Sequence, residues 1–221
     1  MNTWSLAAIC GIDVWYPGLL LEIPSLARRM FENVKTDIHR LTDQESHLIV
    51  KFGVVFFNLG LHAVLLYRLS RWLYVHRLGP LSVVISYLSS ILTGSQISPR
   101  AAVGKGLVIY HPQGTVIGPT VIGNYCTLTL SNLIGQLQGG GDRPVVGDHF
   151  YAGAGAKILG RIRIGNHVHV GPNSLVIKSL PDGVTAIGAP AKVIYRSEMA
   201  RATTDEPISR KKAIESEKSP S

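Results

Sequence analysis

Few residues of this chain have types and positions suited to chemistry, and His111 is the most distinctive of them. It lies in the segment YHPQG (110–114), where a regular spacing of aliphatic residues is interrupted. An imidazole can take a proton from a hydroxyl and return it to a leaving group, so a loop histidine is a candidate general base. His62 lies in an apolar segment and is expected to be structural, whereas the histidines at later turn positions are expected to be solvated.

The charge and the cysteines disfavour several other classes of function. The net charge is +8, but lysine and arginine are scattered, and the densest basic run (210–212) lies in a polar tail. The sequence shows no cluster of zinc ligands and no basic-aromatic RNA-binding motif, so we expect neither a metal nor a nucleic acid as partner. A small phosphate-bearing ligand explains the excess positive charge at least as well as a nucleic acid does. Cys10 and Cys126 are the only cysteines, which fits a reducing compartment, and we expect a cytoplasmic protein.

The most apolar stretch is residues 52–67, FGVVFFNLGLHAVLLY. It is shorter than the roughly 20 residues that a membrane-spanning helix needs, and Asn58 and His62 interrupt it. Its aliphatic residues recur at three- and four-residue intervals, which predicts a buried amphipathic helix. Peripheral contact with a membrane stays open as an alternative. No secretory signal is expected, because the N-terminus lacks a basic region.

From Ile97 onward, an aliphatic residue recurs every six positions and is mostly followed by a small one. The repeat runs in three phases, which are Ile97, Val103 and Ile109; Ile122, Leu128 and Ile134; and Val146, Ala152, Ile158, Ile164, Val170 and Val176. A six-residue period fits short strands that are joined by tight turns and stacked in coils, so that stability comes from the stacking. A β-sandwich with coincidental spacing is the alternative, and twelve positions in three phases disfavour it.

This pattern divides the chain into four parts. They are an N-terminal extension of uncertain role (1–44), a helical segment (45–95), the repeat domain (96–195) and a polar tail that is expected to be disordered (196–221). The array is interrupted between Ile109 and Ile122, and again by the Gly-rich insertion GQLQGGGDRP (135–144). Loops carried by a rigid scaffold often hold binding and catalytic residues, so both interruptions are candidate sites.

Three segments of the chain resemble the serine O-acetyltransferases, a branch of the hexapeptide-repeat acyltransferases. They are GLHAVLLYRLSRWLYVHRLG (60–79), GDHFYAGAGAKILGRIRIGNHVHVGPNSLVIK (147–178) and LPDGVTAIGAPAKVI (180–194). The resemblance implies a mainly-β fold, namely a left-handed parallel β-helix preceded by a small α-helical segment. It also implies an acetyl-CoA-dependent O-acetyltransferase that forms a homotrimer, with active sites between neighbouring chains. The short helical segment favours a trimer over a hexamer.

The resemblance assigns roles to individual residues. The family's D-H-x-x-G segment matches residues 110–114, which makes His111 the base. Two family aspartates are replaced, one by Tyr110 and the other, fifteen residues before the histidine, by Gln96. Gln96 can hold an imidazole tautomer by hydrogen bonding, but it cannot stabilise an imidazolium by charge. The family loop G-D-R-H-P has lost its histidine here, and Arg143 remains as a candidate substrate contact.

These replacements remove groups that would recognise the ammonium and carboxylate of an amino acid. We therefore predict that the acceptor is a sugar hydroxyl in polysaccharide or glycan biosynthesis, with Tyr110 offering a stacking face. L-serine, acetylated for cysteine biosynthesis, is one alternative. A non-catalytic trimeric β-helix scaffold is another.

The resemblance also implies a path for acetyl-CoA. The family binds the pantetheine arm through backbone groups beside small residues on adjacent coils. The matching small residues are Gly135, Ala154, Gly155 and Ala156. Backbone N–H groups near Gly135 are expected to stabilise the oxyanion. The lysines expected to meet the nucleotide phosphates are Lys157, Lys178 and Lys192.

Overall fold

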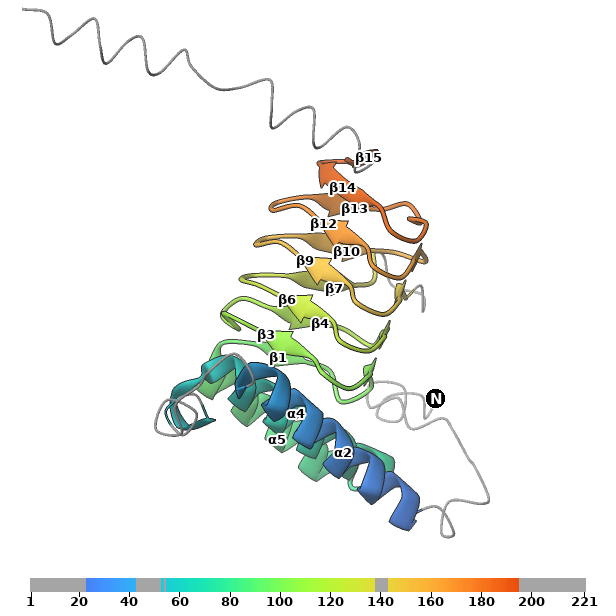
Figure 1. Cartoon of the computed structure of the whole chain (residues 1–221). Coiled ribbons are helices and arrows are strands. Elements are labelled where there is room, and N and C mark those ends of the chain that lie inside the picture. Colours follow the sequence, from blue (N-terminus) through green and yellow to red (C-terminus); the bar gives the residue numbers. More distant parts are fainter. Residues whose placement is uncertain (1–22, 43–52, 54, 138–142, 195–221) are drawn as a thin grey trace, which may run out of the picture.

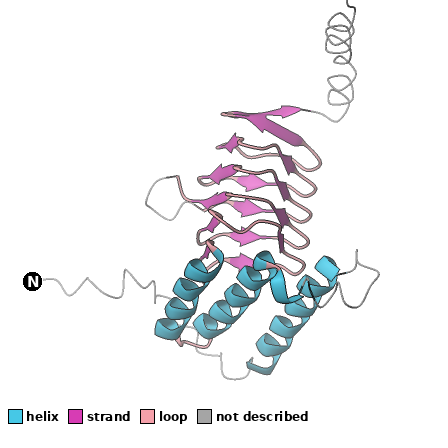
Figure 2. Ribbon diagram, turned by 90° about the vertical axis from the view of Figure 1, so that its left-hand side faces the viewer, coloured by secondary structure: helices cyan, strands magenta, loops and turns pink. Residues whose placement is uncertain are grey.

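A computed structural model describes residues 23–42, 53, 55–137 and 143–194, with side chains from residue 30 onward. Three helices lie side by side across one end of a column of flat coils (Figures 1 and 2). They are α2 (Ile23–Thr42), α4 (Leu59–Val75) and α5 (Gly79–Thr93). Residues 23–42 of the expected N-terminal extension thus form α2, whereas the expected tail (196–221) lies outside the described residues.

Local signals determine the ends of α4 and α5. Asn58 caps α4, because its Oδ1 accepts a hydrogen bond from the N–H of Leu61 at 2.9 Å. Pro80 lies in the first turn of α5, where its missing N–H has no cost, and Gly94 ends the helix with a φ of 68°.

The predicted single helix over 52–67 is wrong in extent, because Asn58 starts a new helix and leaves Phe57 86% exposed. No helix in the described ranges is long and apolar enough to cross a membrane.

The column of coils consists of short strands in three sheets. The strands are β1 (Gln96–Ile97), β2 (Ala102–Val103), β3 (Val108–Ile109), β4 (Val116–Ile117), β5 (Val121–Ile122), β6 (Thr127–Leu128), β7 (Leu133–Gly135), β8 (Val145–Val146), β9 (Tyr151–Ala152), β10 (Lys157–Leu159), β11 (Arg163–Ile164), β12 (His169–Val170), β13 (Leu175–Val176), β14 (Thr185–Gly188) and β15 (Ala191–Ile194). Pairing is parallel throughout, except that β14 and β15 form an antiparallel hairpin at the far end.

As far as β13, each sheet takes every third strand, so one coil contributes one strand to each of three faces. The orders are β1-β4-β7-β10-β13, β11-β8-β5-β2 and β15-β14-β12-β9-β6-β3. Val146 pairs with Ile164, eighteen positions further along the chain, which is three six-residue units per coil. The predicted fold class, a mainly-β parallel β-helix preceded by helices, is confirmed.

The interior of the column is filled by the residues of the repeat. All twelve aliphatic positions identified in the sequence are buried, as predicted. The following residue is often glycine because neighbouring coils touch there. A Cβ on Gly147, for example, would lie 2.7 Å from the carbonyl oxygen of Gly165, closer than side chains approach in practice.

The interruption between Ile109 and Ile122 is a longer corner in an unbroken array. Ile117 of β4 fills the inward position and is 1% exposed. It comes eight positions after Ile109 and five before Ile122, instead of six and six. The extra residues form the corner that carries His111.

The first coil rests on helices instead of on another coil. Arg68 of α4 donates hydrogen bonds to the carbonyls of Val103 and Gly104. The hydroxyl of Tyr67 donates to the carbonyl of Ala101 at 2.7 Å and accepts the N–H of Val103 at 3.2 Å. Burial raises the pKa of Tyr67, so this hydroxyl keeps its proton. These side chains form hydrogen bonds with backbone groups of the first coil that would otherwise bond to a further coil.

Helix α2 completes this cap through a buried ion pair. Asp37 and Arg68 lie 3.0 Å apart, and Asp37 also accepts the N–H of Leu107 at 2.9 Å. Burial raises the pKa of the Asp37 carboxyl, and the charge and hydrogen bonds of Arg68 oppose that rise. Arg40 donates to the carbonyl of Cys126 at 2.9 Å, one coil higher. Helices α2 and α4 are therefore joined to the first coils by polar contacts, several of them buried.

Candidate active site

His111 lies on the corner between β3 and β4, and its imidazole is exposed. Among the described residues it has no hydrogen-bond or ion-pair partner, so the ring is free to bind a ligand. The turn that follows is closed by a 2.9 Å bond from the N–H of Thr115 to the carbonyl of Pro112. Gly114 takes the position in this turn that requires a positive φ, here 71°.

The turn is held from two sides. The N–H of Gly114 donates to the carbonyl of Gly94 at 2.8 Å, which joins it to the end of α5. On the other side, the backbone N–H and the hydroxyl of Ser131 both donate to the carbonyl of Gln113 at 3.2 Å. The backbone carrying His111 is therefore fixed, although the imidazole itself is not.

Helix α4 also positions this corner. A Cβ on Gly60 would lie 1.7 Å from the carbonyl oxygen of Ile109, the last residue of β3. Only a residue without a side chain lets α4 approach β3 so closely. The GLHA segment thus places the strand from which Tyr110 and His111 emerge.

Two of the predicted cofactor residues stack on the same corner as His111. The N–H of Gly155 donates to the carbonyl of Leu130 at 2.8 Å, next to Ser131, whose N–H donates to Gln113 on the His111 turn. Ala154 precedes Gly155, and both are partly exposed. Adjacent coils lie about 4.8 Å apart, so these residues lie about 10 Å along the column from the His111 turn. This corner forms a continuous ridge from the base to the predicted pantetheine path.

Other predicted cofactor residues lie elsewhere. The Ala156 side chain is fully buried in the core, between the repeat positions Ala152 and Ile158, so only its backbone is left to meet a ligand. Gly135 ends β7 at the opposite corner of the same sheet, with open space where a Cβ would be. Lys157 and Lys178 are exposed at β10 and after β13, and Lys192 is exposed on β15. A single chain does not bring Gly135 and His111 together.

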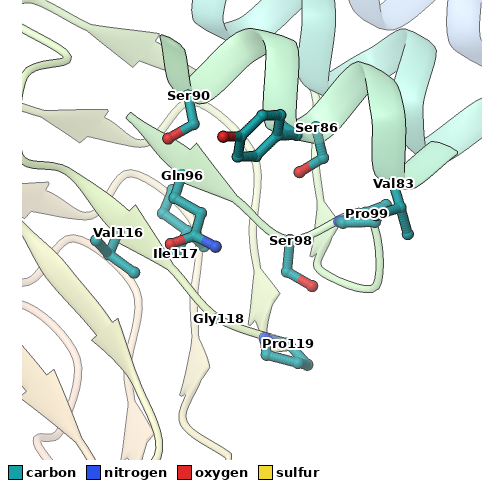
Figure 3. A pocket seen from close by; sticks show the side chains of 11 residues that line it. Val83, Ser86, Ser90, Gln96, Ser98, Pro99, Val116, Ile117, Gly118 and Pro119 are labelled. Atoms are coloured by element: carbon teal, nitrogen blue, oxygen red, sulfur yellow. The ribbon is translucent and has the colours of Figure 1, made fainter. Parts of the chain in front are cut away.

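Gln96 lines a pocket instead of contacting His111. The pocket, about 590 Å³ in volume, lies between α5 and strands β1 and β4. Figure 3 shows the Gln96 amide among Ser86, Ser90 and Ser98. No hydrogen bond in the described part of the chain joins Gln96 to the imidazole, because β1 directs this side chain outward beneath α5. The lining residues carry no formal charge.

The other two predicted substrate contacts lie at the surface. Tyr110, the residue before His111, is 48% exposed, and its N–H donates to the carbonyl of Leu128 at 3.1 Å. Arg143 is exposed at the start of the segment leading into β8. Its neighbours Gly141 and Asp142 in the family-like loop lie outside the described residues.

The described parts contain no group of three or more His, Cys, Asp or Glu that could hold a metal ion.

The supports of the His111 turn were not found from the sequence. Gly94 could have been recognised as a helix C-cap from the Thr93-Gly94 end of an apolar run. Ser131 gave no signal, because its contact with Gln113 depends on how two coils are aligned.

Comparison with known proteins connects this geometry to a family. The bacterial transferase hexapeptide (six repeats) family model matches residues 143–178. Serine acetyltransferase from Synechococcus elongatus is 35% identical over 171 residues, which are 76% of this chain and 70% of that protein. The Helicobacter pylori J99 serine acetyltransferase is 37% identical over 162 residues, 72% of this chain and 95% of that protein. The chain belongs to the serine acetyltransferase family.

Solved structures agree with this membership. Serine acetyltransferase from Neisseria gonorrhoeae superposes with a TM-score of 0.73 at 29% identity, covering 86% of this chain and 74% of that one. Another serine acetyltransferase, solved in complex with CoA, gives a TM-score of 0.70 at 26% identity, covering 80% and 74%. The predicted left-handed β-helix and the predicted enzyme class, an O-acetyltransferase, are confirmed. The CoA complex supports acetyl-CoA as the co-substrate.

Proposed function

We propose that this family member transfers the acetyl group of acetyl-CoA to the hydroxyl of L-serine, with His111 as general base. The observation that carries the proposal is the exposed, unpartnered imidazole of His111 on the same ridge as Ala154 and Gly155. The relatives are named for serine, and one matches over 95% of its length. They support serine better than the sugar acceptor predicted from the sequence.

The reaction follows from the position of the base. The His111 imidazole takes the proton of the serine hydroxyl as its oxygen attacks the thioester carbonyl of acetyl-CoA. The resulting oxyanion is stabilised by backbone N–H groups. When the C–S bond breaks, the imidazolium returns its proton to the CoA thiolate. The exposed guanidinium of Arg143 is the candidate partner for the serine carboxylate.

We propose that a homotrimer completes the site. In one chain, His111 and Gly135 lie at opposite corners of one sheet, so a neighbouring copy is needed to bring such corners together. Helix α5 supports this proposal, because Val83, Val84 and Ile91 expose large apolar surfaces. Scattering measurements of mass in solution test the assembly, and a monomeric active enzyme would contradict it. The cytoplasmic location and a peripheral membrane contact remain predictions.

A sugar acceptor is the second candidate, favoured by two observations. The pocket that holds Gln96 is lined by hydroxyls, an amide and apolar side chains without any formal charge, which suits a neutral ligand with hydroxyls and apolar ring faces better than a zwitterion. Tyr110 next to His111 also replaces the aspartate that the family places there.

Release of free CoA thiol from acetyl-CoA tests these proposals. The purified protein is assayed with L-serine and, separately, with a panel of monosaccharides. We expect turnover with L-serine, and a loss of roughly 10²- to 10⁴-fold in kcat for His111→Gln. His169→Gln, an exposed histidine on β12, is the matched control and should keep full activity.

Each outcome has a distinct meaning. Turnover with a sugar exceeding that with serine would replace the proposed acceptor. Equal rates for His111→Gln and the parent would refute the proposed base. No thiol release with any acceptor would favour a non-catalytic scaffold.

A further inference from the structure

Helix α5 buries its small polar residues and exposes its apolar ones, the reverse of an ordinary surface helix. Its buried residues are Ser82, Ser89 and Thr93. The Ser82 hydroxyl donates to the carbonyl of Ser70 on α4 at 2.8 Å, so the two helices meet through small side chains. The large apolar side chains that α5 exposes are Leu81, Val83, Val84, Tyr87, Leu88, Ile91 and Leu92. This much exposed hydrocarbon indicates a face that contacts another surface.

The exposed residues of α5 point in different directions. Ser86 donates to the carbonyl of Ile97 in the first coil at 3.2 Å, which shows the side of the helix that faces the column. Successive residues turn by about 100° around a helix, so Leu81, Leu88 and Leu92 lie on the side away from the column. The residues that support the proposed trimer lie nearer the column, and they are Val83, Val84 and Ile91.

Helix α4 adds one leucine to this outward side. Tyr67 and Arg71 both donate to the carbonyl of Ala101 in the first coil. Leu69 lies two residues from each, on the opposite side of the helix, and is 40% exposed. Since α4 and α5 lie side by side across the end of the column (Figures 1 and 2), these leucines share one end of the molecule. We name as the end face the four residues Leu69, Leu81, Leu88 and Leu92.

The charge near the end face is positive. Residues 46–141 contain six lysines and arginines and no acidic residue. Arg77, in the turn between α4 and α5, is exposed next to Leu78, which is 47% exposed. On α2, the exposed carboxylate of Glu32 is balanced by Lys35 one turn later. A second copy packed on this face would bring further positive charge, whereas an anionic surface brings the opposite charge.

We propose that the end face binds the surface of a membrane that contains anionic lipids. The leucines enter the boundary between the headgroups and the acyl chains, and Arg77 meets lipid phosphates beside them. The burial of the leucines supplies the apolar part of the binding, and the positive charge selects anionic lipids. This binding is independent of the acceptor assigned to His111.

Cosedimentation of the full chain with vesicles tests the lipid class. The vesicles consist of phosphatidylcholine alone or of phosphatidylcholine with about a third of phosphatidylglycerol. We expect binding to the anionic vesicles and at least about fivefold weaker binding to the neutral ones. Arg77→Gln should weaken binding to anionic vesicles about fivefold. Arg163→Gln, an exposed arginine on β11, is the matched control for charge and should bind like the parent.

Leucine variants locate the contact. The double variant Leu81→Gln/Leu92→Gln keeps the charge and removes apolar side chains, and we expect at least about a tenfold loss of binding to anionic vesicles. Val121→Gln is the control, because Val121 on β5 is 48% exposed, as Leu81 is, and lies outside the helices. It should bind like the parent.

A fluorescent label decides the question if the double variant fails to fold. In a Cys10→Ser background, a polarity-sensitive dye on Leu92→Cys should shift to the blue with anionic vesicles, and the same dye on Val121→Cys should not. No binding to anionic vesicles, equal binding of the double variant, or no dye shift at position 92 would refute the proposal. Equal binding to neutral and anionic vesicles would also refute it. A solution mass of the parent twice that of the double variant would overturn it in favour of a second copy on the end face.

Discussion

The N–H of Gly114 donates a 2.8 Å hydrogen bond to the carbonyl of Gly94, and this bond joins the His111 turn to the end of helix α5. Both glycines have a positive φ, at 71° and 68°. The helical segment and the β-helix therefore meet at the candidate base. Changes in the helical segment should consequently reach the chemistry without touching a substrate.

Gly114→Ala should lower both stability and activity. A Cβ at this position has an unfavourable φ and would lie 2.6 Å from the Ser131 hydroxyl. We expect a loss of about 2 kcal/mol in the free energy of unfolding. We also expect about a 10²-fold loss in kcat, because small displacements of a base are costly. Gly183→Ala is the control, since its φ is 72° but its Cβ would meet no atom within 4 Å. It should lose about 1 kcal/mol and keep full activity. Unchanged kcat in Gly114→Ala would show that the turn does not position His111.

Gly60→Ala should separate α4 from β3. The added Cβ would overlap the carbonyl oxygen of Ile109, so we expect about 3 kcal/mol of lost stability in urea unfolding. Gly79→Ala, at the start of α5 with open space around its Cβ, should be neutral or slightly stabilising. Equal stabilities for the two variants would contradict the close approach of helix and strand.

Asp37→Ala should leave the buried guanidinium of Arg68 without its ion-pair partner. Removing one member of a buried pair costs about 3–5 kcal/mol, so the melting temperature should fall strongly. Glu32→Ala removes an exposed carboxylate from the same helix and should change stability by less than about 0.5 kcal/mol. A similar small effect for both variants would mean that α2 does not support the first coil.

Cys126 should be unreactive in the folded protein. Burial raises the pKa of its thiol to about 11, whereas an exposed thiol titrates near about 8.5. In a Cys10→Ser background, a thiol reagent at pH 8 should label Cys126 only after denaturation. Rapid labelling of the native protein would contradict its burial.

The same shift predicts how stability depends on pH. The unfolded chain loses the thiol proton first, so the contribution of Cys126 is complete below about pH 8.5 and is lost as the pH rises towards about 11. The difference in unfolding free energy between the parent and Cys126→Ala should therefore shrink by about 1 kcal/mol per pH unit in this range. The pH-dependent contributions of other titrating groups are the same in both proteins, so they cancel in this difference.

The sequence determined the β-helix because its information is local and repeated. Each aliphatic residue such as Ile158 or Ile164 must point inward once short strands stack, and a glycine such as Gly147 must follow where coils touch. The same reasoning placed His111 at a break in the repeat, and the resemblance of residues 110–114 to the family segment then made it the candidate base. It missed Ile117, because this residue lies eight positions after Ile109 and five before Ile122, so neither spacing matches the six-residue repeat.

Only the tertiary structure decided what lies around His111. The contacts of Gly114 with Gly94, of Gln113 with Ser131 and of Gly60 with Ile109 join segments far apart in the chain, and their partners depend on the register between coils and helices. For the same reason the sequence placed Gln96 beside the imidazole. In the fold, the side chain of Gln96 lies beneath α5. Spacing along a chain determines which residues face inward, whereas distances across it arise only when the coils stack.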